Sequence, residues 1–333
     1  MTHTPRTKAD WAPGGGDAAS PVAAGRAPAT GRTTRTAAHG GLGRAGAASG
    51  GLARRQALCA LAVGLVPATA RPATGRLVVT DGGLAEIVVA LGGAHLLVAV
   101  GHDADHLAEL SPVPRLPEMP EPSADPLLAA DPTRVVIGAE WATPRTLDEL
   151  HQAGVRVHVV DSEPTAAGVA RRIRIVAAML QKSAEGEALV ARFQRDMQGV
   201  ARLIARVPRR PRALFVRAVE REPLRVAGHR NAMSALLGLL GTDNVAGAFD
   251  GFEPMGRQAM IAAAPEFILT NPAGTAAQDG LPLALHAPGA LETPAGRGQR
   301  LIVVHGPDLH GIGLHTPRGI RRLGRQLHPT IFA

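Results

Sequence analysis

Residues 76–93 read RLVVTDGGLAEIVVALGG, a short β-branched run followed by a glycine pair and an apolar pattern of helical period. A strand, a tight turn and a helix in this order make one α/β unit. The pair Gly82-Gly83 lets the backbone turn sharply and leaves the N–H groups of the helix N-terminus near the end of the strand. Such N–H groups suit a carboxylate or another anion, so Gly82 and Gly83 are candidate ligand-binding residues.

The same alternation of strands and helices continues along the chain. Further strands are expected at residues 97–100, 134–137, 155–160, 213–217, 224–227, 266–269 and 301–304. Helices are expected near residues 123–130, 144–153, 232–240, 256–264, 281–291 and 317–327. This order predicts an α/β fold with mainly parallel sheets, arranged as two Rossmann-like lobes.

A long helical region separates the two lobes. It runs from about residue 165 to residue 207, has an expected break near 181–183, and ends at a proline-rich turn. We therefore expect a single long helix to join the lobes and to allow only small movements between them. A ligand would bind in the cleft between the lobes, beyond the carboxyl ends of the strands. The expected divisions are 1–70, 71–164, 165–210 and 211–333.

The first division is expected to be a disordered leader that ends in a signal peptide. Arg54-Arg55 precede the apolar run of residues 57–66, and Ala68-Thr69-Ala70 follows it. A charged start, a short apolar segment and a small-x-small site form a secretory signal. We expect export to the periplasm or cell envelope after cleavage near Ala70. Cys59 leaves a lipid anchor open as an alternative, although the residues before it are a poor lipobox.

Composition excludes several classes of function. The formal charge of +8 belongs mostly to residues 1–70, which hold eight of the 36 basic and two of the 28 acidic residues. No basic stripe is interleaved with aromatic residues in the rest of the chain, so we expect no nucleic-acid partner. Neither a P-loop nor a GxGxxG motif follows a strand, and no Ser-His-Asp or Cys-His arrangement is visible. A nucleotide-dependent α/β enzyme is therefore the weakest hypothesis, and we expect a protein that is not an enzyme.

Several phrases together resemble the haemin-binding substrate-binding proteins of ABC importers, within the helical-backbone class that also serves cobalamin and ferric siderophores. They are residues 76–93, 226–244, 251–254, 262–269 and 293–297, and the resemblance covers about residues 76–329. It implies a binding protein that captures haemin, or a related iron or cobalt chelate, in the cleft between the lobes. It also implies delivery of this small-molecule ligand to an ABC permease with its ATPase. We expect a monomer.

The sequence departs from the family pattern at the position of the iron ligand. In the haemin-binding relatives a tyrosine follows the second strand and resembles an axial ligand of the iron, whereas Glu118 stands at that position here and Met119 follows it. A carboxylate is a weaker ligand of ferric haem than a phenolate. Either Glu118 or Met119 binds the iron, or another residue has taken over, or the ligand is different.

Histidine is the natural substitute because neutral imidazole is a good ligand for haem iron. His102 and His106 follow the second strand, and a helix there would place both rings on one face. His229 lies at the mouth of the second lobe, and so does His315. Arg230, beside His229, is a candidate for binding a haemin propionate.

A bare or weakly chelated metal ion is the second hypothesis. His102, His106 and Glu118 would then be its ligands.

The resemblance also implies one acidic residue on each lobe that docks against arginines of the permease. Asp125 matches the first position. Gln258 stands at the second position, where glutamate is usual, and Glu253 is the nearest acid that could compensate. Charge complementarity of this kind sets orientation and association rate more than affinity.

Overall fold

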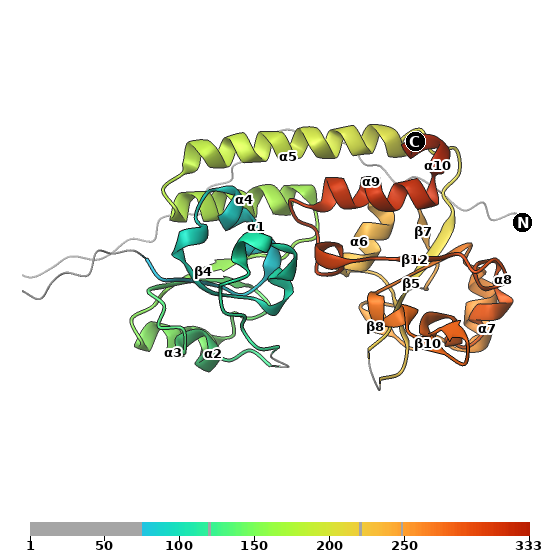
Figure 1. Ribbon diagram of the computed structural model, residues 1–333, viewed down its shortest axis with the longest axis horizontal. Helices are drawn as coiled ribbons and strands as arrows, with labels where there is room; N and C mark the ends of the chain where they lie inside the picture. The colour runs from blue at the N-terminus through green and yellow to red at the C-terminus, as the bar shows by residue number, and fades with distance from the viewer. Residues whose placement is uncertain (1–74, 119–120, 220–221, 248) are drawn as a thin grey trace, which may run out of the picture. The chain divides into compact units, whose positions relative to one another are not determined.

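The computed structural model describes residues 75–118, 121–219, 222–247 and 249–333, which belong to one compact unit (Figure 1). The expected leader and signal peptide, with Cys59 and Ala70, lie outside the described residues, and so does Met119. In the described ranges no helix is both long and apolar enough to cross a membrane.

The first half is built on a four-stranded parallel sheet with the order β2-β1-β3-β4. Its strands are β1 (Leu77–Val79), β2 (Leu97–Val100), β3 (Arg134–Gly138) and β4 (Arg156–Val160). The central strand β1 is fully buried, as expected for an apolar strand covered on both faces. Around the sheet lie α1 (Gly82–Ala90), η1 (Ala94–Leu96), η3 (Ala108–Leu110), α2 (Asp125–Leu128) and α3 (Pro144–Gln152).

The second half contains a mixed sheet with the order β12-β9-β5-β6-β8, and β7 pairs with β5. Strands β5 (Arg212–Arg217), β9 (Phe267–Thr270) and β12 (Leu301–Val303) are parallel. The antiparallel part comprises β6 (Arg225–Ala227) and β8 (Phe252–Glu253), and the short β7 spans Asp243–Asn244. Helices α6 (Ala232–Leu239), α7 (Arg257–Ala263), α8 (Pro294–Arg297) and α10 (Pro329–Phe332) complete this half with η4 (Pro272–Thr275).

The helix expected at residues 281–291 does not form, so this prediction is wrong. Residues 281–291 form the end of a small hairpin, β10 (Ala277–Gln278) with β11 (Leu281–Pro282), and then two 3-10 turns, η5 (Leu283–His286) and η6 (Ala290–Glu292). Proline supplies no N–H at positions 282 and 288, and Gly289 has a positive φ of 82°. These residues interrupt a segment whose apolar composition is otherwise compatible with a helix.

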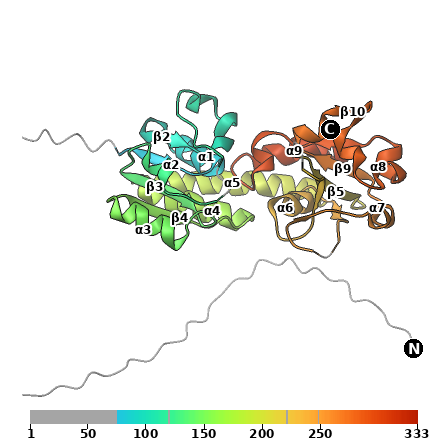
Figure 2. The ribbon, with the colours of Figure 1, turned by 90° about the horizontal axis from the view of Figure 1, so that it is seen from below.

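Two helices make up the long helical region, and the expected break near residues 181–183 is confirmed. Helix α4 (Ala166–Met179) packs against α1 and against α5 (Ser183–Ile204), and Gln181 between them has a positive φ of 59°. Helix α5 also contacts α9 (Thr316–Leu327) of the second half. It therefore runs along both halves, above α4 and α9 in Figure 1 and behind both sheets in Figure 2.

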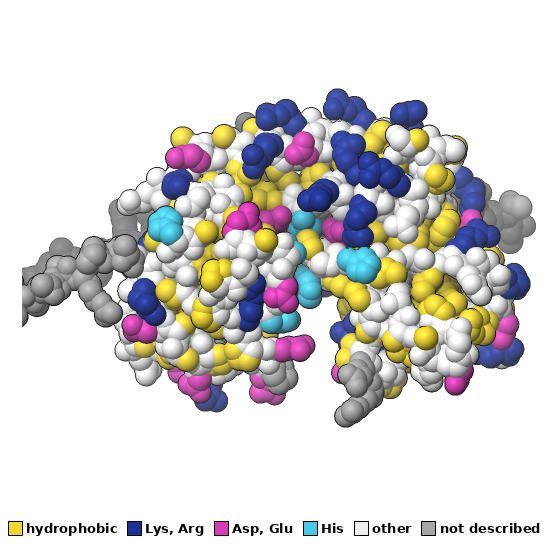
Figure 3. Space-filling view, in the orientation of Figure 1, with side chains coloured by type: hydrophobic (Ala, Val, Ile, Leu, Met, Phe, Trp, Pro, Cys, Tyr) yellow, Lys and Arg dark blue, Asp and Glu magenta, His cyan; other side chains and the backbone are white. Residues whose placement is uncertain are grey.

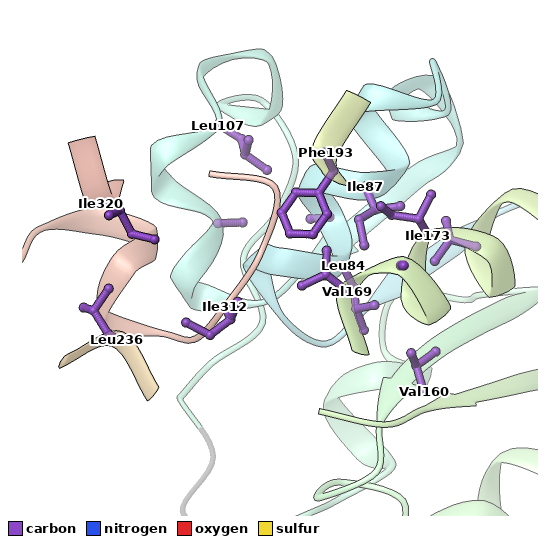
Figure 4. Close-up of a cluster of buried hydrophobic side chains, with 14 of the residues drawn as sticks. Leu84, Ile87, Leu107, Val160, Val169, Ile173, Phe193, Leu236, Ile312 and Ile320 are labelled. Atoms are coloured by element: carbon purple, nitrogen blue, oxygen red, sulfur yellow. The ribbon is translucent and has the colours of Figure 1, made fainter. Parts of the chain in front are cut away.

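A single hydrophobic cluster ties the halves together (Figure 4). It contains Leu84 of α1, Ile173 of α4, Phe193 of α5, Leu236 of α6 and Ile320 of α9, all of which are buried. Because helices of both halves contribute to one core, separating the halves would expose apolar surface.

Candidate functional site

Four histidines meet where the two halves adjoin, and we call them the histidine cluster: His102, His106, His310 and His315. The segment η2 (His102–His106) follows β2, η7 (Gly306–Leu309) follows β12, and the two segments contact each other. The ring centroids of His102 and His310 are 6.2 Å apart with perpendicular planes, and those of His106 and His315 are also 6.2 Å apart. Figure 3 shows histidine and acidic side chains gathered around the hollow in the middle of this face.

The backbone of η2 explains why its two histidines have different partners. A 3-10 helix has about 3.0 residues per turn, so residues four positions apart point in different directions. His102 is exposed and faces His310, whereas His106 is partly buried and faces His315. An α-helix here would have placed both rings on one face, and the 3-10 helix that forms instead does not.

His315 is held on both sides of its ring. Its Nδ1 lies 3.0 Å from Glu86 Oε2 of α1, and its Nε2 lies 3.2 Å from the carbonyl oxygen of Gly311. Nearby, a guanidinium N–H of Arg172 in α4 donates to the carbonyl oxygen of Ile312. The loop before α9 is thus fastened to two helices of the first half, and His315 would have to leave an acceptor before it could bind a metal.

A cavity of about 620 Å³ opens beside this contact. Asp308, His106 and His315 line it, and Asp308 is 5 % exposed. One oxygen of Asp308 accepts a hydrogen bond from Arg322 Nη2 at 2.8 Å, while its other oxygen and the Nε2 of His106 are buried without a partner among the described groups. A buried unpaired polar atom costs about 1–3 kcal/mol, so this wall of the cavity favours a polar occupant.

The glycine pair at the start of α1 faces carboxylates of the chain itself. Gly82 N–H donates to Asp103 Oδ1 at 2.7 Å, and Leu84 N–H donates to Asp81 Oδ1 at 2.8 Å. A Cβ at Gly82 would lie 2.7 Å from the backbone oxygen of Asp103, so only glycine fits there. The sequence predicted a carboxylate at these N–H groups, and the structure supplies internal ones, which leaves Gly82 N–H unavailable to an external anion.

Replacing Asp81 with asparagine is expected to make the stability of the protein less sensitive to pH. Burial is the main reason that the pKa of Asp81 rises from 3.8 to about 7, and the charge of Asp103 adds to the effect. The folded state therefore binds the proton more tightly, and wild-type stability falls as pH rises from 3.8 to about 7, by up to about 4 kcal/mol. Asparagine keeps the N-cap hydrogen bond and cannot ionise.

Urea denaturation of Asp81→Asn between pH 4 and pH 8 checks this, with Glu266→Gln as the contrasting variant. A hydrogen bond from Arg209 lowers the pKa of Glu266 to about 2, so its contribution is present above pH 4.5 and is lost as pH falls toward about 2. Relative to wild type, Asp81→Asn should gain stability as pH rises from 4 to 8, whereas Glu266→Gln should be less stable by a nearly constant amount, because Glu266 is ionised in both the folded and the unfolded state over most of this range. A constant difference between Asp81→Asn and wild type across this range would contradict the assignment.

The other predicted ligand residues lie apart from the histidine cluster. Glu118 is exposed in a loop of the first half. His229 and Arg230 are exposed in the loop between β6 and α6, where Arg230 Nε is 3.5 Å from Asp250 Oδ2. Throughout the described ranges no three His, Asp or Glu side chains are close enough together to hold a metal ion, so His102, His106 and Glu118 do not form a preassembled metal site.

The predicted docking residues are all exposed. Asp125 is the first residue of α2, Glu253 lies in β8, and Gln258 lies in α7. Figure 1 shows α2 on one half and β8 on the other, at the edge away from α5.

Sequence reasoning missed three residues of the site, namely His310, Asp308 and Glu86. His310 and Asp308 lie in the same loop as His315, after the expected strand at residues 301–304. Their position beyond the end of that strand could have identified them as candidates. Glu86 is the single charged residue of the otherwise apolar helix α1, and this was the one signal it gave, because its partner His315 is 229 residues away in the sequence.

The family model described as periplasmic binding protein matches residues 77–306. The chain belongs to this family. No curated protein sequence matches the chain significantly. Its relatives of known structure are binding proteins rather than enzymes.

Three solved structures show the similarity in detail. The periplasmic heme-binding protein BhuT, in complex with two hemes, is 32% identical with a TM-score of 0.70, and the match covers 78% of this chain and 99% of BhuT. RhuT, the periplasmic heme-binding protein from Roseiflexus sp. RS-1, is 27% identical with a TM-score of 0.71, covering 77% and 99% of the two chains. A periplasmic heme-binding protein from Pseudomonas aeruginosa is 27% identical with a TM-score of 0.69, covering 77% and 93%.

Proposed function

We propose that this periplasmic binding protein captures haemin between its two halves and delivers it to an ABC permease that works with an ATPase. The observation that carries the proposal is the histidine cluster, in which imidazoles from η2 face imidazoles from the segment after β12. BhuT and RhuT are both named as heme-binding proteins, which supports the same cargo for this chain. The protein acts as a monomeric binding protein and not as an enzyme, and haemin is its cargo.

His102 and His310 are the proposed ligands of the haemin iron. Both residues are exposed, whereas both ring nitrogens of His315 already face acceptors and His106 is partly buried. Partial desolvation lowers the pKa of His310, the charge of Asp103 opposes this shift, and the neighbouring histidines reinforce it. A lowered pKa keeps the imidazole neutral at physiological pH, which is the form that binds iron. The chain has no tyrosine to compete for this role.

The remaining predicted residues take supporting roles in this proposal. Arg230 is exposed and its ion pair with Asp250 is long, so its guanidinium is free to turn toward a haemin propionate. Asp125 and either Gln258 or Glu253 are the proposed contacts with the permease, and their exposure supports this role. Export through a signal peptide that ends near Ala70 would bring the protein to the periplasm.

Titration of the purified full chain with haemin, followed by absorbance, tests the proposal. Saturable binding with a shifted Soret band is expected, because a histidine ligand changes the coordination of the iron. Iron-free protoporphyrin is the matched control and should bind more weakly, since it lacks the coordinated metal. No saturable change with haemin, together with binding of cobalamin or a ferric siderophore, would overturn the haemin assignment and keep the family.

A further inference from the structure

A second feature lies on the helices that run along both halves. Helices α5 and α9 contact each other, and a Cβ at Gly199 of α5 would lie 3.2 Å from a guanidinium nitrogen of Arg321 in α9. Around this contact lie six exposed arginines, which we call the arginine face: Arg192, Arg195, Arg202, Arg206, Arg321 and Arg325. Arg192, Arg195 and Arg202 lie in α5 at spacings of three and seven residues, which match the helical period of about 3.6 and place these side chains on one side of the helix. Arg206 follows in the turn just after the helix ends at Ile204.

The arginine face has little negative charge around it. Residues 188–206 and 316–333 together contain eight arginines and one acidic residue, Asp196. Across the described ranges no ion pair is formed by any member of the face. Figure 3 shows the resulting gathering of basic side chains above the hollow, over α9 and along the upper edge.

Neighbouring arginines behave differently, which makes this a local property. Arg171 and Arg174 of α4 pair with Glu163 and Glu187, and Arg209 and Arg210 after α5 pair with Glu266 and Asp243. These four neighbouring arginines therefore have carboxylate partners, which the six members of the arginine face lack within the described part of the chain. Crowding like charges without counter-charges costs free energy, and a bound anionic partner would recover it.

We propose that the arginine face binds an anionic lipid surface. Guanidinium groups form paired hydrogen bonds with phosphate oxygens, and three of them are spread along about 15 Å of α5, so they would reach several lipid headgroups at once. Two phenylalanines belong to this part of the fold, Phe193 of α5 and Phe332 of α10, which packs against α5 and α9. Both are buried and so cannot stack on nucleic-acid bases. Phospholipid headgroups, which need no stacking, fit this surface better than a nucleic acid.

The position of the face leaves the candidate site free. Helices α5 and α9 lie at the edge away from α2 and β8, where the proposed docking residues are found (Figure 1). A protein attached through the arginine face would therefore keep its histidine cluster and its docking positions accessible. The proposal does not depend on the identity of the cargo.

Vesicle sedimentation of the full chain tests this proposal. The protein should sediment with vesicles containing about one third phosphatidylglycerol, should not sediment with pure phosphatidylcholine, and should dissociate in high salt. Each arginine near a charged membrane strengthens binding by about fivefold, so Arg195→Gln, Arg202→Gln and Arg206→Gln combined should weaken it by at least about tenfold. The matched control combines Arg145→Gln, Arg156→Gln and Arg257→Gln, three exposed arginines elsewhere, and lowers the net charge equally.

The basic leader is present in every variant, so a difference in binding between variants must come from the substituted arginines. Weak binding of the first triple variant with near wild-type binding of the control supports the proposal. Equal binding by both variants would assign the interaction to overall charge or to the leader and overturn it. Tighter binding of single-stranded nucleic acid than of phosphatidylglycerol vesicles through the same arginines would also overturn it. The far-ultraviolet circular dichroism of the first triple variant should match that of wild type, which excludes misfolding as the cause.

Discussion

Replacing His310 with alanine is expected to weaken haemin binding by at least about tenfold and to move the Soret maximum. The reason is that His310 supplies a neutral imidazole from the second half, opposite His102 of the first half at a ring separation of 6.2 Å. Replacing His102 with alanine should have a similar effect. The double variant should lose the histidine-type spectrum altogether, because ferric iron would then be left with weaker oxygen ligands or water.

The matched control is His95→Ala, which removes an exposed histidine of η1 outside the cluster and should leave the titration unchanged. Affinity should also depend on pH in a defined direction. Because desolvation lowers the pKa of His310 from 6.5, binding should persist as pH falls to 6.5 and should be lost below it, as the imidazole takes up a proton. If His106→Ala or His315→Ala alters the spectrum while His102→Ala and His310→Ala do not, the inner pair holds the iron and our assignment is wrong.

Replacing Phe193 with alanine is expected to lower the free energy of unfolding by about 3–5 kcal/mol. Phe193 lies in the middle of α5, is 3 % exposed and belongs to the hydrophobic cluster shared by both halves. Removing its ring leaves a cavity beside α5, which is the only one of the described helices that runs along both halves. Both halves should therefore be destabilised together, in one cooperative transition.

Urea unfolding followed by two signals checks this expectation. With Trp11 replaced by phenylalanine in every variant, fluorescence of Trp141 reports on the first half, and far-ultraviolet circular dichroism reports on the helices of both halves. The two curves should coincide for wild type and for Phe193→Ala, at a lower midpoint for the variant. Leu291→Ala, which shortens a leucine that is 46 % exposed, is the matched control and should change stability by less than about 1 kcal/mol. Two separate transitions would mean that the halves fold independently and that the shared core is weak.

Most strands were predictable because their signal is local. The runs at residues 97–100 and 134–137 are apolar apart from Arg134 and are bounded by polar or glycine-containing turns, and the structure has strands there within one residue. The break near residues 181–183 was also visible from polar residues inside an apolar helical pattern. The failure at residues 281–291 has the same origin, since composition there favoured a helix and the two prolines decided against it.

The candidate site was only partly predictable. His102, His106 and His315 were identified because they follow strand ends, which such folds place near the cleft. Their pairing was not predictable, because it depends on the 3-10 geometry of η2 and on the approach of η7. The same holds for Glu86, which no residue near it in the sequence marks as a partner of His315.

By itself the sequence determined the α/β pattern, the two-part organisation around a helical region, and the residue types available for binding iron. These properties follow from hydrophobic periodicity and from proline and glycine positions, which act over a few residues. Tertiary structure alone decided that His310 faces His102, that the carboxylates of Asp81 and Asp103 occupy N–H groups at the start of α1, and that one core spans both halves. Such contacts join residues far apart in the chain, so they exist only once the helices and sheets have packed against one another.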